Sequence, residues 1–411
     1  MAKERDAQLA VLGACIAIFC PGALTFGFPG VMASIWQEMF DVGRAATGLT
    51  IFFMLAAVGA FMFLVGRWQE RWGLRRMIAL GIILTAFASL VVSVANSICT
   101  AYLWAFINGM ASSFVYVPAL TLVQWCYPKR RGLVAGLVSM VFGLSAAIMS
   151  PLFAEMLSAF GYQLMNLYLA ALTLFIGLLG AYFARAPRAW EDAASARRAG
   201  GAAAWPAAQI VSARSFTVSE SLQTRSFWLL WVTWTFAGAA GVSMTILATE
   251  YGLFLGFSLP SAILILTAFN LTNGMSRLIS GILSDRFGRN QIMSLAFLAA
   301  ACAYFLLLWA HALEICALLA AVVGFSFGTL FSVSAPLVAD CFGLDHFGAI
   351  FGLTFAAYGF VAGPLGPTLS GYLLAVTADN FFLVFLYLGV FCLIASLCIR
   401  RVVPPPAELR H

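Results

Sequence analysis

The chain has 411 residues, of which 63% are hydrophobic and only 9% are charged. Soluble globular domains carry about 25% charged residues, so a folded chain of this size would lack the polar surface that water requires. The composition excludes a water-soluble protein and indicates that a lipid bilayer solvates most of its surface.

Twelve apolar stretches are long enough to cross a bilayer as helices. They cover residues 9–35, 45–66, 77–95, 98–126, 133–158, 162–184, 226–251, 259–284, 292–310, 314–339, 347–374 and 380–400. The first stretch is longer than the apolar core of a signal peptide, and we interpret it as an uncleaved first helix. The sequence predicts an all-α membrane protein with twelve transmembrane helices.

The positive charges indicate how the chain crosses the membrane. With the N-terminus in the cytoplasm, 22 − 2 = 20 of the Lys and Arg residues fall in the tails and in the gaps that face the cytoplasm. The other two are Arg44, on the outer side, and Arg277, inside a span. Lys and Arg favour the cytoplasmic side, so we expect a multi-pass protein of the inner membrane with both termini cytoplasmic. Topology accounts for the basic loops, and no nucleic-acid partner is expected.

Two sets of residues recur at a nearly constant offset. The first set reappears 215 positions later: Gly66, Glu70, Arg71 and Gly73 correspond to Gly281, Asp285, Arg286 and Gly288. The second reappears 216 positions later: Gly132, Gly136, Gly143 and Pro151 correspond to Gly348, Gly352, Gly359 and Pro367. The repeat predicts two parallel six-helix bundles, residues 1–184 and 226–411, joined by a cytoplasmic linker at 185–225. Such repeats place the binding site between the halves near mid-membrane.

Two segments resemble known transporters. Residues 281–289, Gly-Ile-Leu-Ser-Asp-Arg-Phe-Gly-Arg, resemble the loop signature of the major facilitator superfamily, and the first-half copy resembles it with Glu70 in place of the usual aspartate. Residues 127–137, Tyr-Pro-Lys-Arg-Arg-Gly-Leu-Val-Ala-Gly-Leu, resemble the sequence shared by monocarboxylate transporters and oxalate/formate antiporters. The resemblance implies the major facilitator fold and a secondary transporter of a small organic anion.

The loop motifs also imply a gate. A carboxylate at a helix end can contact the positive N-terminus of a neighbouring helix. By similarity to the superfamily, Glu70 would contact the start of the eleventh helix and Asp285 the start of the fifth, which would close the cytoplasmic side. The same motifs contribute Arg71, Arg286 and Arg131 to the expected gate. The alternative is that these residues only hold tight inner turns.

Arg277 is a cation expected inside the membrane. It precedes Asp285 by 285 − 277 = 8 positions, which places it about 12 Å from the helix end. A guanidinium at such depth costs roughly 2.5–3.5 kcal/mol on insertion scales. Two acids, Glu155 and Glu250, fall inside or at the end of a span, and both are expected near the outer ends of their helices. Whether either takes part in coupling stays open.

A guanidinium can donate two parallel hydrogen bonds to a carboxylate, so Arg277 is expected to bind the anion. Asn270 and Asn273 lie on the same helix face and offer amides to the cargo. The alternative is a structural arginine, satisfied by carbonyl groups or water, or reaching toward the cytoplasm.

The resemblance also bears on coupling and cargo. Monocarboxylate transporters usually have an aspartate where this chain has Asn273, which cannot titrate, so proton symport and anion exchange both stay open. Oxalate/formate antiporters carry a lysine in the eleventh helix, which has no cation here. One cavity charge favours a lactate-, pyruvate- or formate-like cargo over oxalate.

Further residues are expected to line the site. Tyr116 resembles the tyrosine of the fourth helix that lines it in this branch, and the others are Leu24, Phe327, Phe331, Phe355 and Tyr358. For the phenylalanines, core or lipid contact is an equally good explanation.

Other functions have less support. The sequence has no nucleotide-binding motif, no catalytic set at a shared depth and no metal-like spacing among its 9 Cys and 3 His residues. We therefore expect no enzyme, metal or cofactor, and a monomer that works on gradients. The alternatives are an oxalate/formate-type dicarboxylate antiporter, an efflux carrier for an amphipathic compound, and a sensor without transport.

Overall fold

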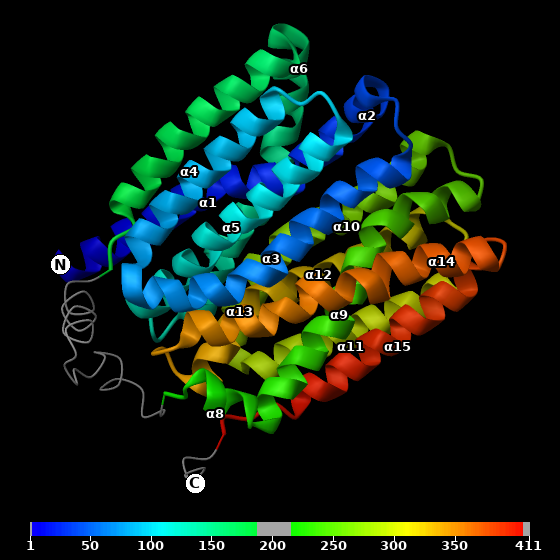
Figure 1. Ribbon diagram of the computed structural model, residues 1–411. Helices are drawn as coiled ribbons and strands as arrows, with labels where there is room; N and C mark the ends of the chain where they lie inside the picture. The colour runs from blue at the N-terminus through cyan, green and yellow to red at the C-terminus, as the bar shows by residue number, and fades with distance from the viewer. Residues whose placement is uncertain (1, 187–214, 406–411) are drawn as a thin grey trace. The chain divides into compact units, whose positions relative to one another are not determined.

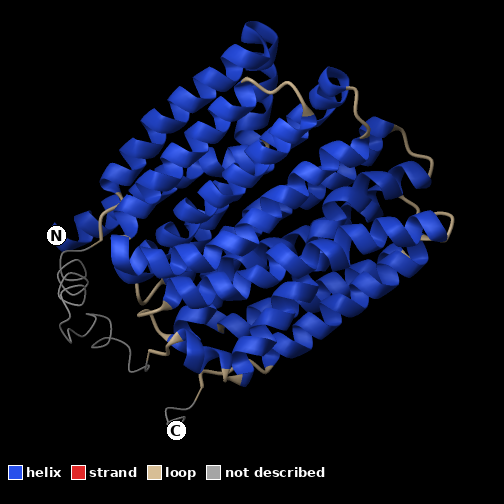
Figure 2. Cartoon of the chain, viewed as in Figure 1, coloured by secondary structure: helices blue, strands red, loops and turns tan. Residues whose placement is uncertain are grey.

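The computed structural model describes residues 2–186 and 215–405. Most of the expected linker, 187–214, lies outside the described residues. In the described part of the chain the regular structure is helical throughout, without a strand (Figure 2). The predicted all-α class is confirmed.

The helices follow the apolar stretches of the sequence (Figure 1). The first half contains α1 (Ala2–Phe26), α2 (Phe28–Phe40), α3 (Arg44–Trp72), α4 (Leu74–Ser93), α5 (Ile98–Cys126) and α6 (Arg131–Phe183). The second half begins with α8 (Val218–Leu222), α9 (Arg225–Phe254), α10 (Leu259–Phe287), α11 (Arg289–Leu307) and α12 (Leu313–Phe342). It ends with α13 (Phe347–Ala357), the π-helical segments η2 (Tyr358–Ala362) and η3 (Pro364–Thr368), α14 (Leu369–Val376) and α15 (Phe381–Arg400).

The described residues form 11 helical segments that are long and apolar enough to cross a membrane, and α6 is one of them. α6 has 53 residues, or about 80 Å of straight helix, whereas a bilayer core is about 30 Å thick. Gly161 interrupts it with a φ of 74°, a conformation that glycine adopts without a steric penalty. Divided there, the described chain has the twelve predicted spans.

The chain clusters into two compact units. The first comprises Met1–Lys129, Val141–Thr217 and Phe342–Ala356, and the second comprises Arg130–Met140, Val218–Cys341 and Ala357–His411. These units differ from the predicted halves at two helix starts. The first turns of α6 belong to the second unit, and most of α13 belongs to the first.

Each unit has its own helix packing. In the first, α5 packs against α1, α3 and α4, and a buried apolar cluster includes Leu24, Phe28, Trp36 and Trp104. In the second, α15 packs against α9 and α11, and α9 also packs against α10 (Figure 1).

The repeated glycines lie where helix backbones approach closely. A Cβ atom on Gly132 would lie 2.2 Å from the carbonyl oxygen of Gly281, and one on Gly136 would lie 2.5 Å from that of Arg277. Since real Cβ atoms do not approach backbone so closely, α6 and α10 can cross here only with glycine at these positions.

The first unit repeats this crossing with α13 and α3. A Cβ atom on Gly66 would lie 2.1 Å from the carbonyl oxygen of Gly348, and one on Gly352 would lie 2.4 Å from that of Met62. Met62 and Arg277 are 277 − 62 = 215 positions apart, so they occupy matching places in the repeat.

Two alanine variants of α3 test this crossing. Gly66→Ala should destabilise the protein by about 1–3 kcal/mol, because the new methyl group overpacks against backbone. Gly48→Ala is the matched control, since a Cβ atom there has nothing within 4 Å. A thermal melt in detergent should show a lower Tm for Gly66→Ala alone, and equal Tm values would contradict the close crossing.

Candidate functional site

Arg277 lies on α10 and is only 2% exposed. Its Nη1 donates a hydrogen bond to the carbonyl oxygen of Ser139 at 3.1 Å, and its Nη2 lies 3.5 Å from Oδ1 of Asn273. The guanidinium carbon lies 4.8 Å from the centroid of the Phe331 ring, within the range of cation–π attraction. These three neutral groups orient the guanidinium.

The contact with Ser139 depends on the glycine crossing. Ser139 belongs to the first turns of α6, which lie in the second unit with α10. Gly136, one turn earlier, lets α6 approach the backbone of Arg277. The glycine repeat of the sequence thus places a carbonyl group against the buried cation.

Phe331, the ring beside Arg277, belongs to a cluster of four aromatic side chains that we call the aromatic group. Its members are Trp234 on α9, Phe327 and Phe331 on α12, and Tyr358 on η2. Phe331 packs edge-on against the other three, with centroid distances of 5.3 Å to Trp234, 5.1 Å to Phe327 and 5.5 Å to Tyr358. The structure thus brings three of the expected residues, Phe327, Phe331 and Tyr358, together with Arg277.

Sequence reasoning missed Trp234. It lies on the same face of α9 as Gly238 and Gly241. A Cβ atom on Gly241 would lie 2.0 Å from the Phe327 ring, and one on Gly238 would lie 2.9 Å from Tyr358. A large aromatic residue followed by glycines at helical spacing was therefore the available signal.

Three of the remaining expected residues, Tyr116, Phe355 and Leu24, belong to the first unit. The ring centroids of Tyr116 and Phe355 are 6.3 Å apart. Leu24 is part of the buried apolar cluster of that unit. Asn270 has an exposed side chain.

The first unit also holds a polar cluster that sequence reasoning did not assemble. Oγ1 of Thr25, on α1, lies 2.7 Å from Oγ of Ser112 and 3.4 Å from Nδ2 of Asn108, both on α5. Asn108 is completely buried and Ser112 is 3% exposed. Buried polar groups of this kind are unfavourable unless they are hydrogen-bonded.

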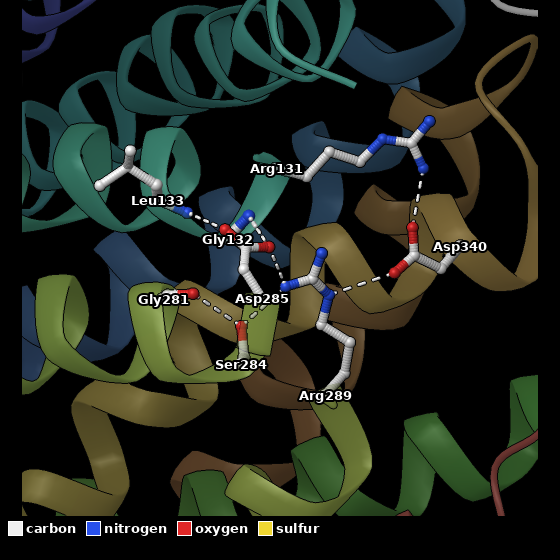
Figure 3. A network of polar contacts seen from close by, with 8 residues as sticks. All are labelled: Arg131, Gly132, Leu133, Gly281, Ser284, Asp285, Arg289 and Asp340. Carbon is white, nitrogen blue, oxygen red and sulfur yellow. Dashed lines mark hydrogen bonds and ion pairs between the residues drawn. The ribbon is translucent and has the colours of Figure 1, made fainter. Parts of the chain in front are cut away.

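Asp285 holds the start of α6 (Figure 3). Its Oδ1 accepts a hydrogen bond from the backbone N–H of Gly132 at 3.0 Å, and its Oδ2 accepts one from that of Leu133 at 2.9 Å. The first N–H groups of a helix have no acceptor within it, and the two carboxylate oxygens supply acceptors here. The negative charge is also favourable at a helix N-terminus. The contact that the sequence suggested for Asp285 is present.

A second acid, Asp340 on α12, extends this network (Figure 3). Its carboxylate accepts hydrogen bonds from Nη1 of Arg131 at 2.8 Å and from Nε of Arg289 at 3.1 Å. Arg289 also forms an ion pair with Asp285, and Arg131 is 2% exposed. Sequence reasoning missed Asp340, because the matching first-half residue, 340 − 216 = 124, is the neutral Gln124.

The matching acid of the first unit has a different partner. Oε1 of Glu70 lies 3.0 Å from Nδ1 of His346, and both side chains are 34% exposed. His346 is the residue before α13 begins, so Glu70 contacts a side chain at that helix start, where the superfamily resemblance suggested the helix start itself. Arg71 and Arg286 are exposed.

Within residues 2–186 and 215–405, no three His, Cys, Asp or Glu side chains are grouped so that they could hold a metal ion. The chemistry of the described site is therefore that of a buried guanidinium, amides, hydroxyl groups and aromatic rings.

Comparison with known proteins supplies a family and several relatives. Residues 14–262 and 227–411 match the family described as the Major Facilitator Superfamily. The "uncharacterized MFS-type transporter YhjX" of Escherichia coli K12 is 24% identical over 369 residues, or 87% of this chain and 86% of that protein. The oxalate:formate antiporter of Oxalobacter formigenes is 25% identical over 251 residues, or 61% of this chain and 57% of that protein.

A solved structure shares the fold. The fucose:proton symporter FucP of E. coli superposes with a TM-score of 0.71 over 96% of this chain and 98% of that chain, at 15% sequence identity. This likeness supports the twelve-helix architecture.

The Asp285 contact can be tested by hydrogen exchange. Asp285→Asn should speed deuterium exchange at the amides of Gly132 and Leu133 about tenfold or more, since a hydrogen bond to a charged group contributes roughly 1.5–3 kcal/mol. Mass spectrometry of a peptide that covers both residues measures the rate. Glu314→Gln is the control, because Glu314 is an exposed acid of the same unit. Unchanged exchange in Asp285→Asn would contradict the contact.

Proposed function

We propose that this chain, which belongs to the Major Facilitator Superfamily, is a secondary active transporter of a small monocarboxylate. Its relatives are membrane transporters and not enzymes. The cargo class is a lactate-, pyruvate- or formate-like acid. The observation that carries this proposal is the buried guanidinium of Arg277.

The chemistry of Arg277 favours a carboxylate. A buried cation in a membrane protein raises the free energy unless negative charge or strong acceptors stabilise it. Two of its acceptors, the carbonyl oxygen of Ser139 and Oδ1 of Asn273, are neutral. A carboxylate would add opposite charge and match the planar donor fork of the guanidinium.

The surroundings of Arg277 favour a cargo with one negative charge and a short apolar part. The segment 347–376 contains no Lys or Arg, so the eleventh span offers no second cation for a second carboxylate. The aromatic group beside Arg277 suits an aliphatic tail, and it disfavours strongly hydrated ions because it cannot replace their water.

Two other cargoes have specific support. The similarity to the oxalate:formate antiporter over 251 residues favours anion exchange of a dicarboxylate. The four rings of the aromatic group favour efflux of an amphipathic compound. We place the monocarboxylate first, since dicarboxylate binding needs a second positive charge and efflux gives Arg277 no role.

Alternating access requires contacts that differ between two states. We assign this role to two contacts. The first is the pair of hydrogen bonds between Asp285 and the start of α6, next to the ion pair of Arg131 with Asp340. The second is the contact of Glu70 with His346. These contacts would close the cytoplasmic side, and they would break when it opens. Arg71 and Arg286, which are exposed, would act at the same membrane surface.

The same proposal covers topology and energy source. The Lys and Arg bias supports an inner-membrane protein with both termini cytoplasmic, and we propose a monomer. Asn273 beside Arg277 cannot titrate, so in a symport mechanism the proton would have to bind another group or the cargo itself. Anion exchange needs no such group.

Substitution of Arg277 tests the cargo class. In proteoliposomes, Arg277→Gln should lower uptake of labelled lactate by at least about 30-fold, since loss of a partner from a buried charge pair costs roughly 2–5 kcal/mol. Arg277→Lys should retain part of the uptake, because it keeps the charge without the fork. Arg76→Gln, at an exposed arginine, should transport normally.

Unlabelled competitors separate the three cargoes. Propionate or pyruvate should compete with lactate more strongly than oxalate does. Stronger competition by oxalate would favour the dicarboxylate antiporter. Normal transport by Arg277→Gln, at equal membrane insertion and Tm, would refute carboxylate binding at this residue.

A further inference from the structure

We propose that Arg75 and Arg185 bind the phosphate group of an anionic phospholipid at the membrane boundary of the first unit. The two side chains come from different helices and converge on the ring of Tyr182. All three residues belong to the first unit. The inference goes beyond the transport function proposed above, and it does not depend on which cargo the chain carries.

Both guanidinium groups lie against one aromatic ring. The guanidinium carbon of Arg75, in the first turn of α4, lies 5.3 Å from the centroid of the Tyr182 ring. That of Arg185, two residues after the end of α6, lies 4.5 Å from the same centroid. Each distance is within the range of cation–π attraction. The two cations are therefore at most 5.3 + 4.5 = 9.8 Å apart. Nε of Arg185 also donates a hydrogen bond to the carbonyl oxygen of Tyr182 at 3.1 Å, which orients this side chain.

The packing of α4 against α6 brings these residues together. A Cβ atom on Gly177 would lie 2.6 Å from the side chain of Ile82, so the two helices approach closely there, and they run side by side in Figure 1. Arg75 precedes this contact by 82 − 75 = 7 positions on α4, and Tyr182 follows it by 182 − 177 = 5 positions on α6. The start of α4 and the end of α6 thus meet at one membrane boundary.

The two arginines lack a resident counter-charge. No carboxylate within residues 2–186 and 215–405 forms an ion pair with Arg75 or Arg185. Glu70, the acid nearest to Arg75 in the sequence, contacts His346 instead. Two positive charges this close repel, because their separation does not exceed the Debye length of about 8–10 Å by much at physiological ionic strength. The neutral ring offsets part of this repulsion, and a bound anion would remove the rest.

The preference of Lys and Arg for the cytoplasmic side does not account for this arrangement. That preference concerns which loops carry positive charge, and it is satisfied equally well by arginines that extend into water away from each other. Here two arginines from separate helices turn toward the same ring. Both are exposed, so a ligand can reach them. Basic pockets between membrane-spanning helices are typical sites for anionic lipid headgroups.

The surroundings favour a lipid over a soluble anion. Tyr182 is 52% exposed, its hydroxyl can donate to a phosphate oxygen, and tyrosine is typical of the membrane–water interface. Toward the membrane interior the same two helices expose large rings, Phe175 on α6 at 74% and Phe87 on α4 at 51%. The guanidinium groups can each donate paired hydrogen bonds to phosphate oxygens, while these rings contact the acyl chains. A soluble anion would use only the polar part of this surface.

The test measures lipid binding to the full chain, delipidated in detergent, by native mass spectrometry. Phosphatidylglycerol is the anionic probe and phosphatidylcholine the zwitterionic one. Arg75→Gln/Arg185→Gln should lower the affinity for phosphatidylglycerol about tenfold or more, since each arginine near an anionic lipid contributes roughly fivefold. The affinity for phosphatidylcholine should change less than about twofold. Arg225→Gln/Arg400→Gln is the control, because it removes the same charge from two exposed arginines of the second unit.

Each outcome supports or refutes the site. Equal losses of affinity in the double variant and in the control would show that only net charge matters and would refute it. Unchanged binding by Arg75→Gln/Arg185→Gln would refute it as well. Inorganic phosphate that displaces the bound lipid at an equal concentration would indicate a soluble-anion site and contradict the lipid.

A second variant keeps the test valid if the first one fails to fold. Arg75→Lys/Arg185→Lys retains both charges without the planar donor fork, and it should bind phosphatidylglycerol with an affinity between those of wild type and the control-corrected loss. Wild-type affinity in this variant would contradict paired hydrogen bonding by the two arginines. None of these results bears on uptake by Arg277 variants, so the proposed function stands or fails separately.

Discussion

The crossing of α6 with α10 is the contact on which the rest of the second unit depends. Gly132 and Gly136 allow the two backbones to approach, and this approach brings the Ser139 carbonyl to Arg277 and the first amides of α6 to Asp285. A ligand that draws the guanidinium away from Ser139 therefore acts on the same helix pair that Asp285 holds together. Under the proposed mechanism, cargo binding and gating would therefore act on the same pair of helices, and no long pathway between them would be needed.

The internal repeat conserves the shape of this crossing but changes its chemistry. Met62 stands where the second unit has Arg277, and Gln124 stands where it has Asp340. Glu70 contacts His346, whereas Asp285 contacts backbone N–H groups and Arg289. The repeated glycines are required in both units because the backbones approach equally closely, whereas the charged residues at the matching positions differ. We therefore expect ion recognition to reside mainly in the second unit.

The sequence predicted those features that depend on local composition. Hydropathy located the spans, and the break between residues 158 and 162 includes Gly161. Features that depend on tertiary contacts were not accessible. Asp340 lies far along the chain from Arg131, and the exchange of helix starts between the units leaves no mark in hydropathy. A single chain shows which residues are costly to bury but not which residues they meet.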